Sequence, residues 1–326
     1  MAAGTAVYLI TGFLGSGKTT FLNRIIEAFP ENRKLMLLMN EFGDVGLDGA
    51  LVEQDGLDML EISKGSIFCV CVKTDFIKGL MDIARYTQPD VLLIEATGVA
   101  NPSDLRKDLK LSIFQDRFQF KEQFCLIDAA NFKDAYDTFT SVEKQIESAT
   151  VFIINKIDAA DGATIAGVKQ IVARHHPDPE FYETEYADIP LEKYLPETVL
   201  PGTEDPVEIS AEELDRFIDE LLAAPGSSMT PPDRLLSKTF IWAGKDLRQL
   251  EKMITMIPAG VTRAKGVVNA GGEVFLLNCV MGQSRIEKID PRESLSVLMN
   301  KVVFIGPPEI IEDVSRMDFN GTLLHE

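Results

Sequence analysis

Cysteine and histidine are both scarce in this sequence. Four cysteines in 326 residues are too few for the disulfide framework of a small secreted domain. Two of them, Cys69 and Cys71, are separated by a single residue, which is more typical of a metal or redox site than of a crosslink. The three histidines are too few to form a histidine-rich metal-binding tract.

Basic residues are outnumbered by acidic ones. The chain has 32 Lys and Arg against 51 Asp and Glu, a formal net charge of −19, and it has no basic run. Such a charge disfavours nucleic acid and anionic membranes as partners and favours solubility. No apolar run reaches the length of a membrane span, and no secretory signal pattern precedes the first predicted strand. We therefore expect a cytoplasmic protein with neither a nucleic-acid nor a membrane partner.

Short apolar runs alternate with amphipathic helical stretches over residues 1–223. This alternation predicts an α/β fold, in which a mostly parallel sheet is covered by helices on both faces. The expected helices include residues 18–29 and 73–86, and the expected strands are residues 5–11, 35–39, 51–53, 58–62, 90–95, 120–127 and 151–155.

Residues 224–233 are rich in proline, glycine and serine, a composition that is typical of a linker. Beyond them, the order of predicted elements changes from alternating strands and helices to mostly strands. The expected elements there are strands at 236–242, 262–269, 273–280, 283–288 and 301–305 and helices at 246–256 and 308–316. The sequence thus predicts a first domain over 1–223 and a smaller C-terminal α+β domain over 234–326, with a mostly antiparallel sheet.

A phosphate-binding loop follows the first predicted strand. Residues 12–19 match the pattern G-x-x-x-x-G-K-[ST] between an apolar strand and an amphipathic helix. Gly12, Gly15 and Gly17 allow backbone N–H groups to turn toward phosphate oxygens, and the helix N-terminus adds a positive dipole. Lys18 can reach the β- and γ-phosphates, and the Thr19 hydroxyl can bind Mg²⁺. The loop predicts nucleotide binding.

A guanine-reading tetrapeptide is expected at residues 155–158, which read N-K-x-D after an apolar run. Alone, such a tetrapeptide is compatible with an ordinary strand-to-helix turn. Downstream of a phosphate loop it predicts GTP rather than ATP, because the Asp158 carboxylate can accept from the ring N–H and the exocyclic amine of guanine. Asn155 and Lys156 would support the base and the loop. Residues 209–211 could add a backbone contact to the base.

A second phosphate-contacting strand is expected over residues 91–95. It ends in the carboxylate of Glu95, which is followed by Ala96, Thr97 and Gly98. Glu95 could orient Mg²⁺ or the attacking water, and the Gly98 N–H could sense the γ-phosphate. The alternative is a strand-end glutamate that is exposed to solvent.

The cysteine segment has two readings. In an extended segment Cys69 and Cys71 face the same side, so both thiolates could reach one soft metal ion. Two thiolates leave a tetrahedral site incomplete, and Glu41, Asp44, Asp48 or water could supply the remaining ligands. The alternative is a pair of half-buried thiols.

Taken together, these motifs resemble the CobW-like GTPases, metallochaperone-type proteins related to the nickel-handling GTPases of urease and hydrogenase maturation. The resemblance covers nearly the whole chain. It rests on residues 11–20, 40–43, 46–48, 95–102, 155–158 and 263–266.

The resemblance implies a GTPase that binds GTP or GDP with Mg²⁺ and couples hydrolysis to the delivery of zinc or cobalt. The recipient would be a client metalloprotein or a cobalamin-related enzyme. Ser16 and Thr20 join the implied nucleotide contacts, and Glu41 joins Lys18 and Glu95 among the implied catalytic residues. Dimerisation across the nucleotide face is implied by the resemblance alone.

This sequence departs from the family at the metal motif, which reads C-x-C-C after a glycine. If Cys69 and Cys71 are the first two cysteines, the third is replaced by Val72; if Gly65 sets the register, the cysteine nearest that glycine is lost. One thiolate is missing in either case. The C-terminus also lacks the family's histidine tract, and His175 and His176, which precede a proline, read as a surface turn.

Our hypothesis is a switch in which GTP and Mg²⁺ order residues 40–56, including Glu41 and Asp48, and so rearrange the metal ligands until hydrolysis releases them. One alternative is a regulatory GTP-binding module that docks on a partner enzyme without carrying metal. Another is a reactivation chaperone for a corrinoid or other metalloenzyme. An ATP-using kinase-like enzyme is disfavoured by residues 155–158.

Overall fold

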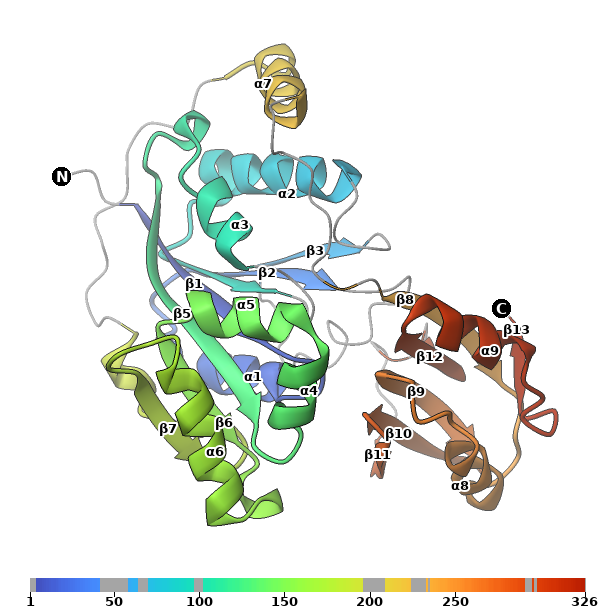
Figure 1. The fold of residues 1–326 in the computed structure, drawn as a ribbon. Helices are drawn as coiled ribbons and strands as arrows, with labels where there is room; N and C mark the ends of the chain where they lie inside the picture. Colours follow the sequence, from blue (N-terminus) through green and yellow to red (C-terminus); the bar gives the residue numbers. More distant parts are fainter. Residues whose placement is uncertain are drawn as a thin grey trace. The chain divides into compact units, whose positions relative to one another are not determined.

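The computed structural model describes residues 4–41, 58–63, 70–96, 102–195, 209–223, 233, 235–290, 295 and 298–325, with side chains undescribed at 40–41, 58–63 and 70–72 (Figure 1). The described chain forms two compact units, the first drawn almost entirely from residues 4–233 and the second from residues 235–325. The strand predicted at 51–53 and all of the predicted linker except Asp233 lie outside the described residues.

A seven-stranded sheet forms the centre of the first unit. Its strands, in spatial order, are β3 (Asp58–Ser63), β2 (Leu35–Glu41), β4 (Val91–Glu95), β1 (Thr5–Gly12), β5 (Phe118–Asp128), β6 (Val151–Asn155) and β7 (Glu180–Thr184). Every neighbouring pair from β2 to β7 is parallel, which confirms the predicted fold class. The sequence analysis located six of these strands and missed β7.

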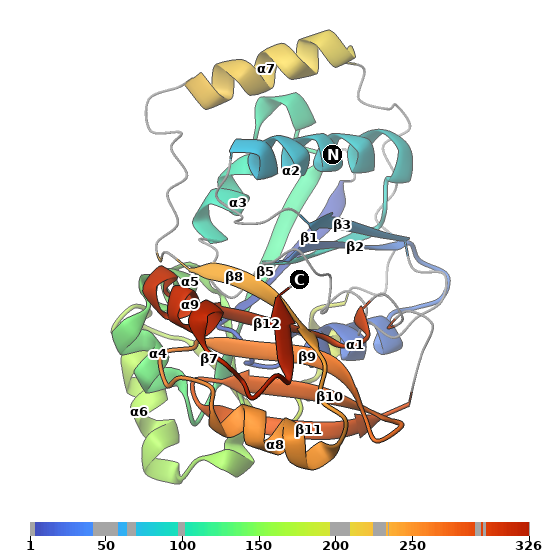
Figure 2. The same ribbon diagram turned by 90° about the vertical axis from the view of Figure 1, so that its right-hand side faces the viewer.

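Helices cover both faces of this sheet, as expected for parallel strands. They are α1 (Lys18–Ala28), α2 (Val70–Asp82), α3 (Pro102–Asp108), α4 (Phe132–Thr138), α5 (Thr140–Ser148) and α6 (Gly162–Ala173). Helix α7 (Ala211–Ala223) lies on the outer side of α2 (Figures 1 and 2). Helices α2 and α3 lie on one face and α1 on the other (Figures 1 and 2). A π-helical turn, Ile83–Thr87, continues α2 toward β4 and accounts for the predicted helical length to residue 86.

Strand β1 is buried on both faces because helices cover both sides of the sheet. Ala6, Tyr8 and Ile10 belong to the core that includes α1. The intervening Val7 and Leu9 are fully buried as well and point to the opposite layer. This burial fixes the position at which the chain leaves β1 and enters the phosphate loop.

The second unit is built on an antiparallel sheet of six strands. In spatial order these are β11 (Gln283–Ile289), β10 (Glu273–Val280), β9 (Arg263–Ala270), β12 (Lys301–Gly306), β8 (Leu236–Trp242) and β13 (Leu323–His325). Helices α8 (Leu247–Thr255) and α9 (Pro308–Arg316) pack their apolar sides into the same core as the sheet. The five predicted strands and two predicted helices of this region are confirmed, and the short β13 was missed.

The start of α5 is capped from a residue that is distant in sequence. Asp233 accepts hydrogen bonds from the backbone N–H groups of Thr140 (2.9 Å) and Ser141 (2.8 Å). The residue in the N-cap position of α5 is Phe139, whose side chain cannot accept such bonds, and the structure gives α5 no local side-chain cap. Asp233 therefore supplies the acceptor that a helix N-terminus needs.

Replacing this acceptor should lower stability. We expect Asp233→Ala to reduce the free energy of unfolding by about 1 kcal/mol, the usual cost of losing a helix cap, as measured by urea denaturation. Asp233→Asn keeps one acceptor oxygen and should lose about half as much. Equal losses for the two variants would contradict a capping role.

Candidate functional site

The phosphate loop leaves the carboxyl end of β1 in a backbone conformation that demands glycine. Gly12 has φ +141° and Gly17 has φ +109°. A Cβ atom at Gly12 would lie 2.4 Å from the carbonyl oxygen of Leu126, and one at Gly17 would lie 2.4 Å from Nδ2 of Asn155. Gly15 also has positive φ, +79°. Gly12 and Gly17 therefore exclude side chains for steric reasons, and the φ of Gly15 is one that other residues rarely adopt.

The amino end of α1 has the features of an anion site. Its N-cap is Gly17, without a side-chain cap, and its first turn has no acidic residue. Thr19 is half-buried and Thr20 is exposed, both in that first turn. Ser16 Oγ is buried and has no hydrogen-bond partner among the described residues. Uncapped N–H groups and a positive helix dipole at this end favour a phosphate.

Lys18 lies over the loop. Its side chain is 7% exposed, and its Nζ donates to the carbonyl oxygens of Gly12 (3.0 Å) and Phe13 (3.3 Å). These bonds hold the ammonium group inside the turn of the loop, where a polyphosphate chain would meet it.

Asn155 joins the phosphate loop to two neighbouring strands. At the end of β6, its Nδ2 donates to the carbonyl oxygen of Ser16 (2.9 Å), and its Oδ1 accepts from the backbone N–H of Ala187 (2.9 Å). The amide is 2% exposed. One side chain thus sets the distance between the loop and the segment that follows β7.

Lys156 and Asp158 take different positions at the end of β6. Lys156 has φ +61°, and its Nζ forms an ion pair with Asp128 Oδ2 (2.7 Å) at the end of β5. Asp158 lies in the 3-10 turn Ile157–Ala159 and is exposed to solvent. The carboxylate predicted to read guanine is accordingly accessible to a ligand.

A backbone contact to the base was predicted from residues 209–211, and this prediction is wrong. The carbonyl of Ile209 accepts a hydrogen bond from Arg85, in the turn that precedes β4 and hence toward the amino edge of the sheet. Ser210 caps the start of α7: its hydroxyl accepts from the backbone N–H of Glu213, and its own N–H donates to the Glu213 carboxylate. Helix α7 lies beside α2 (Figures 1 and 2). The phosphate loop lies at the opposite, carboxyl edge.

The segment after β7, in contrast, lies beside the carboxyl end of β6. Tyr186 and Ala187 both have φ +55°, and the Ala187 N–H is held by Asn155. Tyr186 is 61% exposed beside this turn. Sequence reasoning missed the segment because β7 was not recognised.

Glu95 ends β4 beside the strand that carries the phosphate loop. It pairs in register with Ile10 of β1, and the next N–H, of Ala96, donates to Ile10 O (3.0 Å). Glu95 is 6% exposed, so the alternative of a solvent-exposed strand end is wrong. Gly98 and the side chain of Glu41 lie outside the described part of the chain.

The cysteine segment differs from the prediction in one respect. Helix α2 begins at Val70, three residues before the predicted start, so Cys71 is helical rather than extended. The prediction of an extended segment is therefore wrong at Cys71. Cys69 itself and the side chain of Cys71 lie outside the described residues.

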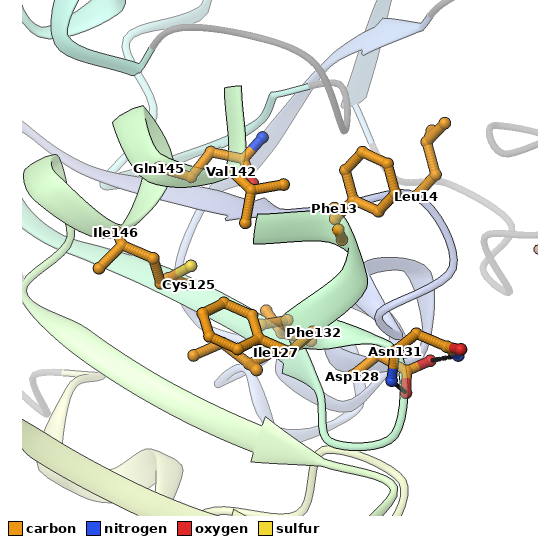
Figure 3. Close-up of a pocket in the computed structure, with 12 residues that line it drawn as sticks. Phe13, Leu14, Cys125, Ile127, Asp128, Asn131, Phe132, Val142, Gln145 and Ile146 are labelled. Carbon is orange, nitrogen blue, oxygen red and sulfur yellow. Dashed lines mark hydrogen bonds between the residues drawn. The ribbon is translucent and has the colours of Figure 1, made fainter. Parts of the chain in front are cut away.

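An apolar cavity lies beneath the phosphate loop. Phe13, Leu14, Cys125, Phe132 and Ile146 are among its lining residues (Figure 3). Burial raises the pKa of the Cys125 thiol to about 12, so this cysteine is protonated at neutral pH.

The same region connects the phosphate loop to α5. The ring of Phe13 packs on that of Phe139, with ring centroids 4.8 Å apart, and Phe139 immediately precedes α5.

Among the described helices, none is both long and apolar enough to cross a membrane.

Known proteins resemble this chain in sequence. Zinc chaperone YeiR of Escherichia coli (strain K12) is 34% identical over 155 residues, 47% of each chain. Zinc chaperone CobW of a Sinorhizobium species is 27% identical over 194 residues, 51% of this chain and 54% of the relative. The alignments thus span about half the length of these relatives. The crystal structure of Zn(II)-bound YjiA GTPase from E. coli aligns over 97% of this chain and 99% of that one, with 20% identity and a TM-score of 0.44.

Two family models match the chain. Residues 243–321 match the C-terminal domain of the cobalamin synthesis protein CobW. Residues 6–183, more than half of the chain, match the CobW/HypB/UreG nucleotide-binding domain. This chain belongs to the CobW/HypB/UreG family.

Proposed function

We propose that the protein binds and hydrolyses GTP and couples its nucleotide state to the binding and delivery of a transition metal. The observation that carries the nucleotide part is the position of Asn155. It ties the carbonyl of Ser16 in the phosphate loop to the turn at Ala187, and it lies three residues before Asp158 in the chain. A nucleotide contacts a base subsite and a phosphate subsite at once, so the two must be held at a fixed distance. The hydrogen bonds of Asn155 would hold them so.

In this proposal the phosphates lie on the loop from Gly12 to Thr19 and on the amino end of α1. Lys18 would exchange its bonds to the loop carbonyls for β- and γ-phosphate oxygens. Thr19, in the first turn of α1, and Glu95, at the end of β4, offer oxygen donors, which suits Mg²⁺. When bound, Mg²⁺ neutralises charge on the phosphates.

Hydrolysis is assigned to Lys18, which neutralises developing charge, and to Glu95, which orients the attacking water. Glu41 at the end of β2 and Gly98 complete the proposed set. We expect GTP hydrolysis to be slow without a partner. Among the described residues, Lys18 is the one cation that this proposal places at the γ-phosphate.

The metal part of the proposal is supported by the relatives, which are named zinc chaperones, and by Cys69 and Cys71. Zn²⁺ or Co²⁺ would be cargo, held by these thiolates with help from Glu41 and passed to a client metalloprotein or cobalamin-related enzyme. The client site would compete for the metal when hydrolysis rearranges the ligands. A homodimer across the nucleotide face and a cytoplasmic location belong to the same proposal.

The coupling is tested by competition for metal with a chromophoric chelator. We expect the reduced protein to bind Zn²⁺ or Co²⁺ at micromolar or lower concentration, with an affinity that differs at least about tenfold, or about 1.4 kcal/mol, between a GTP analogue and GDP. The Cys69→Ser/Cys71→Ser protein should lose that nucleotide-dependent component. Equal metal affinity in all nucleotide states would rule out the coupling.

A second candidate function is a GTP switch that docks on a metallo- or corrinoid enzyme without carrying metal. The missing third thiolate and the helical position of Cys71 favour it. In that case the Cys69→Ser/Cys71→Ser protein would still activate its partner, and the partner would stimulate GTP hydrolysis.

A further inference from the structure

Three potential metal ligands meet where α4, α5 and the end of α6 converge. Glu143 and Glu147 are four residues apart on α5 and so lie on the same face of that helix. His175 lies just beyond the end of α6. The ligand atoms of these three residues all lie within 4.8 Å of one another.

Two hydrogen bonds hold the pair His175 and His176 against α4 and α5. His175 Nε2 bonds to the hydroxyl of Tyr136, on α4, at 2.7 Å. The next residue, His176, bonds through Nε2 to the carbonyl of Ile146 at 2.7 Å. In the tautomer whose Nε2–H donates to Tyr136, Nδ1 of His175 carries the free lone pair. A hydrogen bond to the second ring nitrogen is the usual support of a metal-binding histidine.

The charges around the cluster leave the carboxylates available. Glu147 pairs with Lys144 at 2.7 Å, but these side chains are 40% and 41% exposed, and such a surface pair contributes little. Glu143, Glu147, Asp137 and Arg174 all lie close enough to influence the pKa of Tyr136, so three carboxylates face one guanidinium there. A divalent cation would therefore displace the ammonium group at small cost.

The cluster is separate from the nucleotide site. The ring of His176 packs on Phe152, near the start of β6, with centroids 5.0 Å apart. Asn155, which contacts the phosphate loop, is at the other end of the same strand. The cluster therefore lies toward the amino edge of the sheet, and it includes neither Cys69 nor Cys71.

We propose that Glu143, Glu147 and His175 form a Zn²⁺ site with an open fourth position. One imidazole and two carboxylates are a donor set that zinc accepts, and three protein ligands leave a position for water or a partner's ligand. Bonds of about 2.0–2.2 Å place ligand atoms roughly 3.5 Å apart. Glu143 and His175 are half-buried and Glu147 is exposed, so their side chains can close the remaining distance. The site is an accessory loading position, reached from solvent.

The experiment uses the full-length Cys69→Ser/Cys71→Ser protein, so that the thiolates contribute nothing. We expect one equivalent of Zn²⁺ to bind at micromolar concentration in chelator competition. Co²⁺ at the same site should give d–d absorption without a thiolate charge-transfer band. Binding should also raise the melting temperature, because the ion would link α5 to the end of α6.

Ligand variants then identify the site. Glu147→Gln/His175→Gln should weaken this binding by about 100-fold or more, since even the loss of a supporting second-shell group costs 10–100-fold. Tyr136→Phe should weaken it by about tenfold. The matched control, Glu312→Gln/His325→Gln, changes the same residue types in the second unit and should have no effect.

Two results would overturn the proposal. One is the absence of micromolar Zn²⁺ binding in the cysteine-free protein, and the other is binding that Glu147→Gln/His175→Gln leaves unchanged. Glu147→Gln alone, at an exposed position, keeps the test decisive if the double variant folds poorly. Because the background has no thiolates at 69 and 71, failure here is distinct from failure of nucleotide-coupled metal delivery.

Discussion

Asp158→Asn should weaken GTP binding about 100-fold and give the protein measurable affinity for XTP. A carboxylate accepts two hydrogen bonds from guanine, and each bond to a charged group contributes about 1.5–3 kcal/mol. An amide in the same place offers one acceptor and one donor. Xanthine presents a ring N–H beside a carbonyl oxygen, which matches that pair, whereas guanine presents two donors.

The measurement is displacement of a fluorescent guanine nucleotide by GTP, XTP and ATP. Asp161→Asn is a matched control, because it removes the same charge three residues away. Asp161 caps α6 by accepting from Thr164 N–H at 2.7 Å, and asparagine caps a helix as well as aspartate does. If Asp158→Asn bound GTP with unchanged affinity, Asp158 would not be the residue that recognises guanine.

Gly17→Ala should reduce the affinity for GTP, GDP and their analogues alike by about 100-fold. The new Cβ would lie 2.4 Å from Nδ2 of Asn155, which is itself held by Ser16 and Ala187. Alanine at φ +109° adds backbone strain of about 1–3 kcal/mol. The loop can relieve both only by moving away from Asn155, which separates the phosphate and base subsites.

A matched substitution in α6 distinguishes this local effect from a general one. A Cβ at Gly167 would meet no atom within 4 Å, so Gly167→Ala should stabilise the protein by about 0.5–1 kcal/mol and leave nucleotide binding intact. The pair is compared by nucleotide titration and by thermal unfolding. If Gly17→Ala bound GTP normally, the loop would not need the conformation seen here.

The residues that could be predicted from sequence are those whose chemistry is contained in a short stretch. The phosphate loop is such a stretch, because strand, glycines and helix follow one another and only glycine fits at Gly12 and Gly17. The alternation of strands and helices was sufficient for the fold class. Antiparallel strands of the second unit were equally accessible, since tight turns separate several of them.

Features that depend on spatial neighbours could not be predicted. The turn at Ala187 is positioned by β7, which precedes it. The amino-acid sequence of β7 is polar enough to resemble a loop. His175 was interpreted as part of a surface turn, and nothing in the sequence relates it to Glu143, 32 residues earlier. The prediction for Cys71 failed for a local reason, because α2 begins earlier than its periodicity indicates.

A fragment that contains the first unit alone would have to extend through Asp233. Ending it at residue 223, where α7 stops, would delete the acceptor for Thr140 and Ser141 at the start of α5. That helix start directly follows Phe139, whose ring supports Phe13 in the phosphate loop. The shorter fragment would then have a frayed helix next to its nucleotide site, and its weak binding would be mistaken for a requirement for the second unit.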